Sequence, residues 1–78
     1  MERATTAQQL RERVGRRVAA LRARRGWSQE LLGEHANLSQ VYLSKVENAR
    51  VACSVDTLAA LASALDVGPA ELLTETTD

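Results

Sequence analysis

Residues 40–45 carry side chains that could read the edges of DNA bases. At about 100° per residue, a helix over this stretch places Gln40, Val41, Ser44 and Lys45 on one side, with Tyr42 at its edge. A glutamine amide offers a donor and an acceptor together, which matches N6 and N7 of adenine. Lysine can donate to guanine O6 and N7 or to a phosphate, and valine can contact a thymine methyl group. We predict base contact by these five residues, against the alternative that they are ordinary surface residues of a bundle helix.

The surrounding stretch, 26–50, has the pattern of two short helices joined by a tight turn. Ser28 and Ser39 are residue types that cap helix N-termini, and each precedes a helix-forming run. Asn37 tolerates the left-handed conformation that ends many helices. Two short helices separated by so short a turn have the geometry of a helix-turn-helix. The second helix of such a unit, here in the segment 39–48, can enter the major groove of DNA. The predicted helices span about 29–36 and 40–48.

A long helix is expected before this unit, from a cap at Thr6 to about Arg25. Gly15 interrupts it at a cost of ~1 kcal/mol relative to alanine, which packing must offset. Gly26 follows a basic last turn and is expected to end the helix. The apolar residues at spacings of four, four and three share one face and are expected to enter the core: Leu10, Val14, Val18 and Leu21.

Two further helices are expected after the helix-turn-helix. Ser54 can cap one over 55–65, and a proline that suits the first helical position begins another over 69–73. The polar ends, 1–6 and 74–78, are expected to be disordered. The pattern therefore predicts an all-α fold with five helices.

Length and composition restrict the class of protein. With 78 residues, 45% of them apolar, the chain has room for one domain, 1–78, with one modest core. No apolar run approaches the ~18 residues of a membrane span, and no signal peptide is apparent. Cys53 cannot form an internal disulfide, and with the lone His35 it makes no metal-ligand cluster. We expect no cofactor, no metal and no membrane partner, and a location in the cytoplasm of a bacterium, or in a phage-infected cell, at the nucleoid.

The formal net charge of zero conceals an uneven distribution. Residues 1–50 hold all ten basic residues and five acidic ones, a net charge of +5. Residues 51–78 hold five acidic residues and no basic ones, a net charge of −5. The positive part could meet phosphate groups, although arginine-rich helices are often only solvated surfaces.

Sixty residues of the chain, 14–73, resemble the Cro/repressor-type helix-turn-helix family, also called the xenobiotic-response-element type. The resemblance implies a lambda-repressor-like fold of five helices. It also implies a sequence-specific DNA-binding transcriptional regulator, a repressor or a controller protein, that binds a pseudo-palindromic operator in double-stranded DNA as a homodimer. The segments that carry the resemblance are VGRRVAALRARRGWSQELLG, NLSQVYLSKVENAR, SVDTLAALASALDV and PAELL.

The resemblance also implies roles for individual residues. Gln29 would contact phosphate and brace Gln40, which would read a base. Arg22 would pair with Glu47 and tie the first helix to the third. Further phosphate contacts would come from Arg17, Ser28, Asn48 and Arg50. The family usually has alanine at the position of Gly33 and glycine at that of Ala49, where a positive φ would strain the alanine by ~1–2 kcal/mol.

One domain of this size makes few phosphate contacts, so a dimer with half-sites ~34 Å apart is expected. In small members of the family the dimer surface lies around the fifth helix. Here that surface would comprise Val67, Pro69, Leu72 and Leu73, unless Leu72 only closes the core.

Two other classes of function are the alternatives. An antitoxin or adaptor with this fold would have another protein as its main partner. An enzyme is not expected, because the sequence has no nucleophile–base pair, metal cluster or glycine-rich phosphate loop, and is too short for a sizeable pocket.

Overall fold

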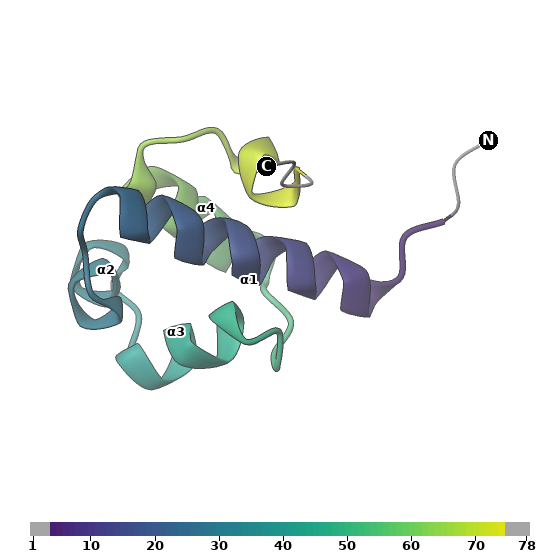
Figure 1. Cartoon of the computed structure of the whole chain (residues 1–78), viewed down its shortest axis with the longest axis horizontal. Helices are drawn as coiled ribbons and strands as arrows, with labels where there is room; N and C mark the ends of the chain where they lie inside the picture. Colours follow the sequence, from purple (N-terminus) through teal and green to yellow (C-terminus); the bar gives the residue numbers. More distant parts are fainter. Residues whose placement is uncertain (1–3, 75–78) are drawn as a thin grey trace.

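The computed structural model describes residues 4–74, and its elements are all helical (Figure 1). The helices of this part of the chain are α1 (Ala7–Arg24), α2 (Gln29–Ala36), α3 (Gln40–Glu47), α4 (Val55–Leu65) and the 3-10 helix η1 (Pro69–Leu73). The expected all-α fold is therefore confirmed, but the count of five α-helices is wrong. The fifth element has only five residues and is wound with i to i+3 bonds such as that from the Glu71 amide to the Gly68 carbonyl, 3.0 Å, because so short a segment does not complete the α-helical pattern.

Local capping fixes where the helices begin, as the sequence predicts. Thr6 and Gln9 form a reciprocal capping box at the start of α1. The hydroxyls of Ser28, Ser39 and Ser54 each accept a hydrogen bond from the amide three residues later, at the starts of α2, α3 and α4. Asn37 ends α2 with φ 60°, which confirms the left-handed turn.

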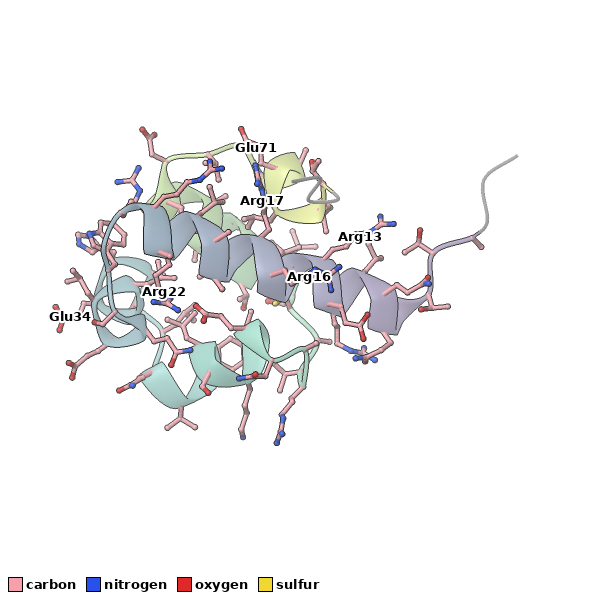
Figure 2. All side chains as sticks on the ribbon, viewed as in Figure 1. Arg13, Arg16, Arg17, Arg22, Glu34 and Glu71 are labelled. Carbon is pink, nitrogen blue, oxygen red and sulfur yellow. The ribbon has the colours of Figure 1, made fainter. Side chains whose placement is uncertain are left out.

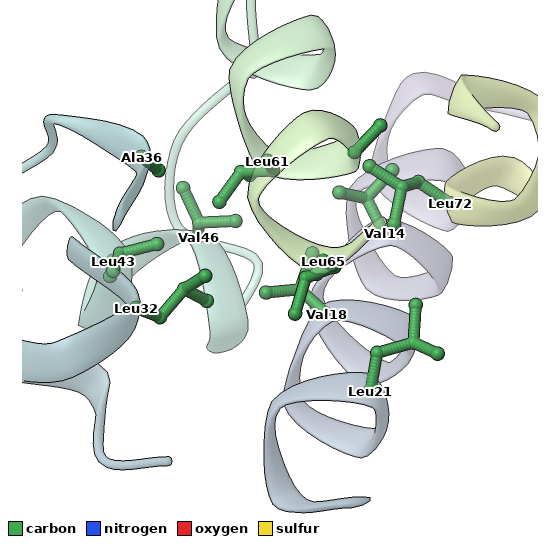
Figure 3. Packing of buried hydrophobic residues seen from close by; sticks show 11 residues of the cluster. Val14, Val18, Leu21, Leu32, Ala36, Leu43, Val46, Leu61, Leu65 and Leu72 are labelled. Carbon is green, nitrogen blue, oxygen red and sulfur yellow. The ribbon is translucent and has the colours of Figure 1, made fainter. Parts of the chain in front are cut away.

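The four α-helices and η1 surround one apolar core (Figure 3). Leu10, expected in this core, is 37% exposed, because α1 extends beyond the helices that it packs against. The tightly buried side chains come from every helix, so each element loses apolar burial if it detaches. They are Val14, Val18, Leu21, Leu32, Ala36, Leu43, Val46, Leu61, Ala62, Leu65 and Leu72.

Two glycines allow the backbones around α3 to approach closely. A Cβ atom on Gly15 would lie 2.6 Å from the Val46 carbonyl oxygen and 2.7 Å from that of Glu47. A Cβ atom on Gly33 would collide with the carbonyl oxygen of Leu38, in the turn before α3. The cost of glycine's low helix propensity in α1 and α2 is thus offset by close packing against α3 and the turn before it.

The predicted disorder of the ends concerns mainly residues outside the described part, 1–3 and 75–78. Within that part, Thr6 is held by its capping box, and the Thr74 hydroxyl donates to the Ala70 carbonyl at 3.0 Å. Between residues 4 and 74, no helix combines the length and the apolar character needed to cross a membrane.

Candidate nucleic-acid interface

The outward side of α3 gathers four of the five residues predicted to contact bases. Gln40, Val41, Ser44 and Lys45 line one open hollow on the surface, and Gln29 of α2 joins them. Val41 is 66% exposed, although it is apolar. On the opposite side of the same helix, Leu43 and Val46 are buried in the core. The amphipathic pattern thus leaves the polar edge of α3 free for a partner.

Tyr42 lies apart from this hollow. It is half-buried, packs against the core and donates a long hydrogen bond, 3.5 Å, from its hydroxyl to the Ala52 carbonyl. Its place at the margin of the helix directs it to the connection between α3 and α4, beside the surface that the other four residues share.

A bidentate ion pair fixes the position of α3 against α1. The Nε atom of Arg22 donates to Oε2 of Glu47 at 2.7 Å, and a terminal nitrogen donates to Oε1 at 2.9 Å. The side chains are only 20% and 6% exposed, respectively. Arg22 also donates to the carbonyl of Trp27 at 2.8 Å, between α1 and α2. These hydrogen bonds to Glu47 raise the pKa of Arg22 above its ordinary value, since they favour the charged form.

Gln29 is held by the same ion pair. Its Nε2 atom donates to Oε1 of Glu47 at 3.0 Å, whereas the family resemblance implied that it braces Gln40. Gln29 and Gln40 both line the hollow beside α3, and Glu47 holds Gln29 in place. Three helices therefore meet at one carboxylate: α1 through Arg22, α2 through Gln29, and α3 through Glu47 itself.

The segment after α3 presents a basic side chain rather than free amides. The backbone amides of Asn48, Ala49 and Arg50 donate to carbonyl groups of α3, at 2.8 to 3.1 Å. The side-chain amide of Asn48 donates to the Ser44 carbonyl at 2.8 Å. Because these donors close the helix end, the exposed guanidinium of Arg50 is the group in this segment best suited to a phosphate.

Arg17, which is predicted to contact a phosphate, does not share this surface. It lies on the side of α1 near η1, with a terminal nitrogen 3.8 Å from Oε2 of Glu71 (Figure 2). Gly15 faces α3, and a residue two positions later is rotated by about 200°, so Arg17 faces away from α3. The phosphate contact by Arg17 stays a prediction, and its place in the fold puts it on another side of α1 than the surface on α3.

Ser28 lies at the exposed start of α2, where its hydroxyl accepts from the Leu31 amide at 3.0 Å. The hydroxyl thus serves first as the helix cap, and the positive end of the helix dipole lies beside it. This combination suits an anion near the start of α2, as predicted for a phosphate.

The residues predicted for a dimer surface separate into two groups. Leu72 is fully buried and closes the core between η1 and the helices, so its assignment to the dimer surface is wrong. Val67 is half-buried and packs on the core. Pro69 and Leu73 are exposed, and Leu73 retains 40% of its accessible surface.

One structural contact near the interface had no signal in the sequence. The rings of Trp27 and His35 stack with centroids 4.4 Å apart and planes within 4°. Arg25 lies 5.1 Å from the centroid of the Trp27 ring and donates to the Leu65 carbonyl at 3.0 Å. These contacts fix the corner between α1 and α2, which carries the Trp27 carbonyl bound by Arg22. Trp27 precedes the cap of α2 and His35 lies in the last turn of that helix, so no helical period could have paired them.

Comparison with known proteins agrees with this geometry. The helix-turn-helix domain family matches residues 4–74. An immunity repressor protein of Bacillus phage phi105 is 41% identical over 64 residues, which are 82% of this chain and 44% of the repressor. The chain therefore spans less than half the length of that relative. An uncharacterized HTH-type transcriptional regulator, y4dJ of Sinorhizobium fredii, is 42% identical over 67 residues, 86% of this chain and 87% of the relative.

A solved structure shares the fold. The P22 c2 repressor protein, crystallised in complex with a synthetic operator, aligns with a TM-score of 0.75 and 30% identity, over 81% of this chain and 96% of that one. The match of the family over the whole described part, together with these relatives, shows that the chain belongs to the helix-turn-helix family of transcriptional regulators.

Proposed function

We propose that this chain regulates transcription by binding a pseudo-palindromic operator as a homodimer, with α3 of each protomer in the major groove. The observation that carries the proposal is the side of α3 opposite Leu43 and Val46. There, Gln40, Val41, Ser44 and Lys45 line a single surface that the core does not need. A helix fits the width of the major groove, and these side chains suit the edges of base pairs.

Each side chain has a chemical counterpart in that groove. Gln40, at the start of α3, offers the paired donor and acceptor that adenine requires. Val41, 66% exposed, offers a methyl contact to thymine, and burying it against DNA removes apolar surface from water. Lys45, exposed one turn later, can donate to guanine or to a phosphate.

Phosphate groups would be held on both sides of α3. The start of α2, with Ser28 and Gln29, supplies a capped helix N-terminus and a side-chain amide. Arg50 supplies a guanidinium after the end of α3. The net charge of +5 over residues 1–50 favours approach of this part to DNA, and the net charge of −5 over residues 51–78 disfavours the other orientation.

Selection of random duplexes for binding to the protein tests the proposal. We expect enrichment of a two-fold symmetric site with half-sites about one helical turn apart. Affinity should fall steeply as salt concentration rises, because counterions are released from the contacted phosphates. Absence of binding to any duplex at low salt, or enrichment without a shared sequence, would overturn the proposal.

Two substitutions separate sequence reading from phosphate binding. Gln40→Ala should remove about 1–3 kcal/mol of preference for the selected site, while binding to random DNA changes little. Arg50→Ala should weaken binding to both kinds of DNA by the same factor. Equal losses on selected and random duplexes for Gln40→Ala would contradict its role in reading a base.

A further inference from the structure

One face of α1 is directed along α3 and the segment after it. Gln8, Gly15 and Arg22 are spaced by seven residues, which returns a helix to nearly the same direction. Arg22 binds Glu47 near the end of α3, and Gly15 packs against the carbonyl groups of α3. Gln8 continues this line, because its Nε2 atom donates to the Ala49 carbonyl at 3.4 Å, across 41 residues of sequence.

The first two turns of α1 extend beyond the core. None of the residues of α1 before Val14 is buried. Figure 1 shows these turns running past the end of α3, beside the connection that leads to α4. This part of α1 is therefore free of a packing role on its outer side, and it lies next to the segment that carries Arg50.

A side-chain network orients an arginine on this extension. The Nε atom of Arg11 donates to Oε1 of Gln8 at 3.0 Å, so Gln8 connects Arg11 to the Ala49 carbonyl. Arg11 also lines an apolar hollow together with Ala52 and Cys53, in the connection after α3, and Leu73 of η1. Since the bond to Gln8 uses Nε, the two terminal amino groups of the guanidinium remain as donors for a further ligand.

Arg11 supplies the positive charge of this network, on the side of α1 that is directed to α3. Glu12 is the nearby carboxylate, and its Oε2 atom accepts from Gln8 at 3.5 Å. Relative to Gly15, Arg11 is rotated by about 40° and remains on the face directed to α3, whereas Arg24 is rotated by about 180°. Arg11 and Arg50 thus belong to one side of the molecule, and Arg24 belongs to the other.

We propose that Gln8 and Arg11 form a second phosphate-binding element, which contacts the DNA backbone beyond the phosphate held by Arg50. The inference rests on the proposed function and extends its binding surface outward from each half-site. Gln8 acts as the positioning residue, and Arg11 supplies the charge. An arginine already held by a hydrogen bond loses less rotamer freedom on binding than a free one.

The test compares Arg11→Gln with Arg24→Gln, which makes the same change of side chain on the opposite face. Dissociation constants for the selected operator and for a random duplex are measured from 50 to 300 mM KCl. Arg11→Gln should weaken both by the same several-fold factor and reduce the slope of log affinity against log salt by ~0.9 per protomer, the value for one phosphate. Arg24→Gln should change the slope by less than half of this amount.

Phosphate ethylation interference gives a second measurement that does not depend on affinity. The wild-type protein should show an interfering phosphate next to the one assigned by Arg50→Ala, and Arg11→Gln should lose only the interference at this outer phosphate.

Arg11→Lys keeps the charge and should keep the slope of log affinity against log salt, which covers the case in which Arg11→Gln does not fold. An unchanged slope and an unchanged interference pattern in Arg11→Gln would overturn this inference. Failure of the wild-type protein to bind any duplex would instead overturn the proposed function.

Discussion

At the scale of the residue, the most informative position is one that departs from its preferred conformation. Ala49 adopts φ 60°, in the left-handed region, where its Cβ atom is crowded by the backbone. Ala49→Gly should remove this strain and raise the free energy of unfolding by ~0.5–1 kcal/mol, after the larger unfolded-state entropy of glycine is subtracted. Thermal denaturation followed by circular dichroism should show a midpoint a few degrees higher, since ~1 kcal/mol corresponds to roughly 4–8 °C in a domain of this size.

Ala59→Gly is the matched control for this substitution. Ala59 is exposed within α4, where the same change should lower the free energy of unfolding by ~1 kcal/mol. If the free energy of unfolding rises for Ala49→Gly and falls for Ala59→Gly, the gain at position 49 is due to its backbone conformation. A loss of stability in both would show that the strain at Ala49 is smaller than the entropy cost of glycine.

At the scale of the element, the carboxylate of Glu47 connects three helices. Arg22→Met removes the bidentate partner and leaves a carboxylate that is only 6% exposed. We expect the free energy of unfolding to fall by ~2–3 kcal/mol, somewhat below the value for a fully buried pair because Arg22 retains contact with water. Urea denaturation of Arg22→Met, Glu47→Met and the double variant measures this quantity.

The double variant should be less destabilised than the sum of the single ones, by ~2 kcal/mol, because it leaves no unpaired charge. Additive losses would show that the two side chains act independently and that the ion pair does not hold α1 on α3. Glu47→Met and the double variant both lose the hydrogen bond from Gln29, so this loss cancels in the difference between the double variant and the sum of the single ones.

At the scale of the element, the features that could be predicted from the sequence are those that depend on one helix and its ends. Ser28, Ser39, Ser54 and Asn37 act on their own helix ends, so local sequence was sufficient to place the starts of α2, α3 and α4 and the turn between α2 and α3. The surface residues of α3 also followed from helical period, since Leu43 and Val46 mark the buried side.

Other features depend on contacts between elements, and local sequence did not predict them. The place of Arg17 depends on the rotation of α1 about its axis, which the contact of Gly15 with α3 sets. The burial of Leu72 depends on how η1 folds back onto the core, and the 3-10 winding depends on its short length. The spacing of Gln8, Gly15 and Arg22 was a usable signal for the extension of α1, but only once one of them is known to face α3.

At the scale of the whole molecule, the acidic part of the chain must face away from DNA if α3 enters the groove. Its residues include Asp56, Asp66 and Glu71, on or beside α4 and η1. A symmetric dimer needs a surface that leaves both copies of α3 exposed, and η1 meets this condition because it packs on the side of α1 that carries Arg17. With Leu72 in the core, the exposed residues of this surface are Pro69 and Leu73, with Val67 at its base.

Leu73→Glu tests that dimer surface. Leu73 is 40% exposed, so the substitution should leave the fold intact, but it places a charge where two copies would exclude water. Sedimentation equilibrium should show a dimer for the wild-type protein and a monomer for Leu73→Glu. Affinity for a duplex with two half-sites should fall by roughly 100-fold or more, while affinity for a single half-site stays the same, because linking two binding modules raises their combined affinity by that order.

Val55→Glu is the control for the added charge, at a position that is 80% exposed at the start of α4. It should change neither the sedimenting mass nor the affinity for the duplex with two half-sites. A wild-type protein that sediments as a monomer, or a Leu73→Glu variant that remains a dimer, would place the contact between protomers elsewhere on the molecule.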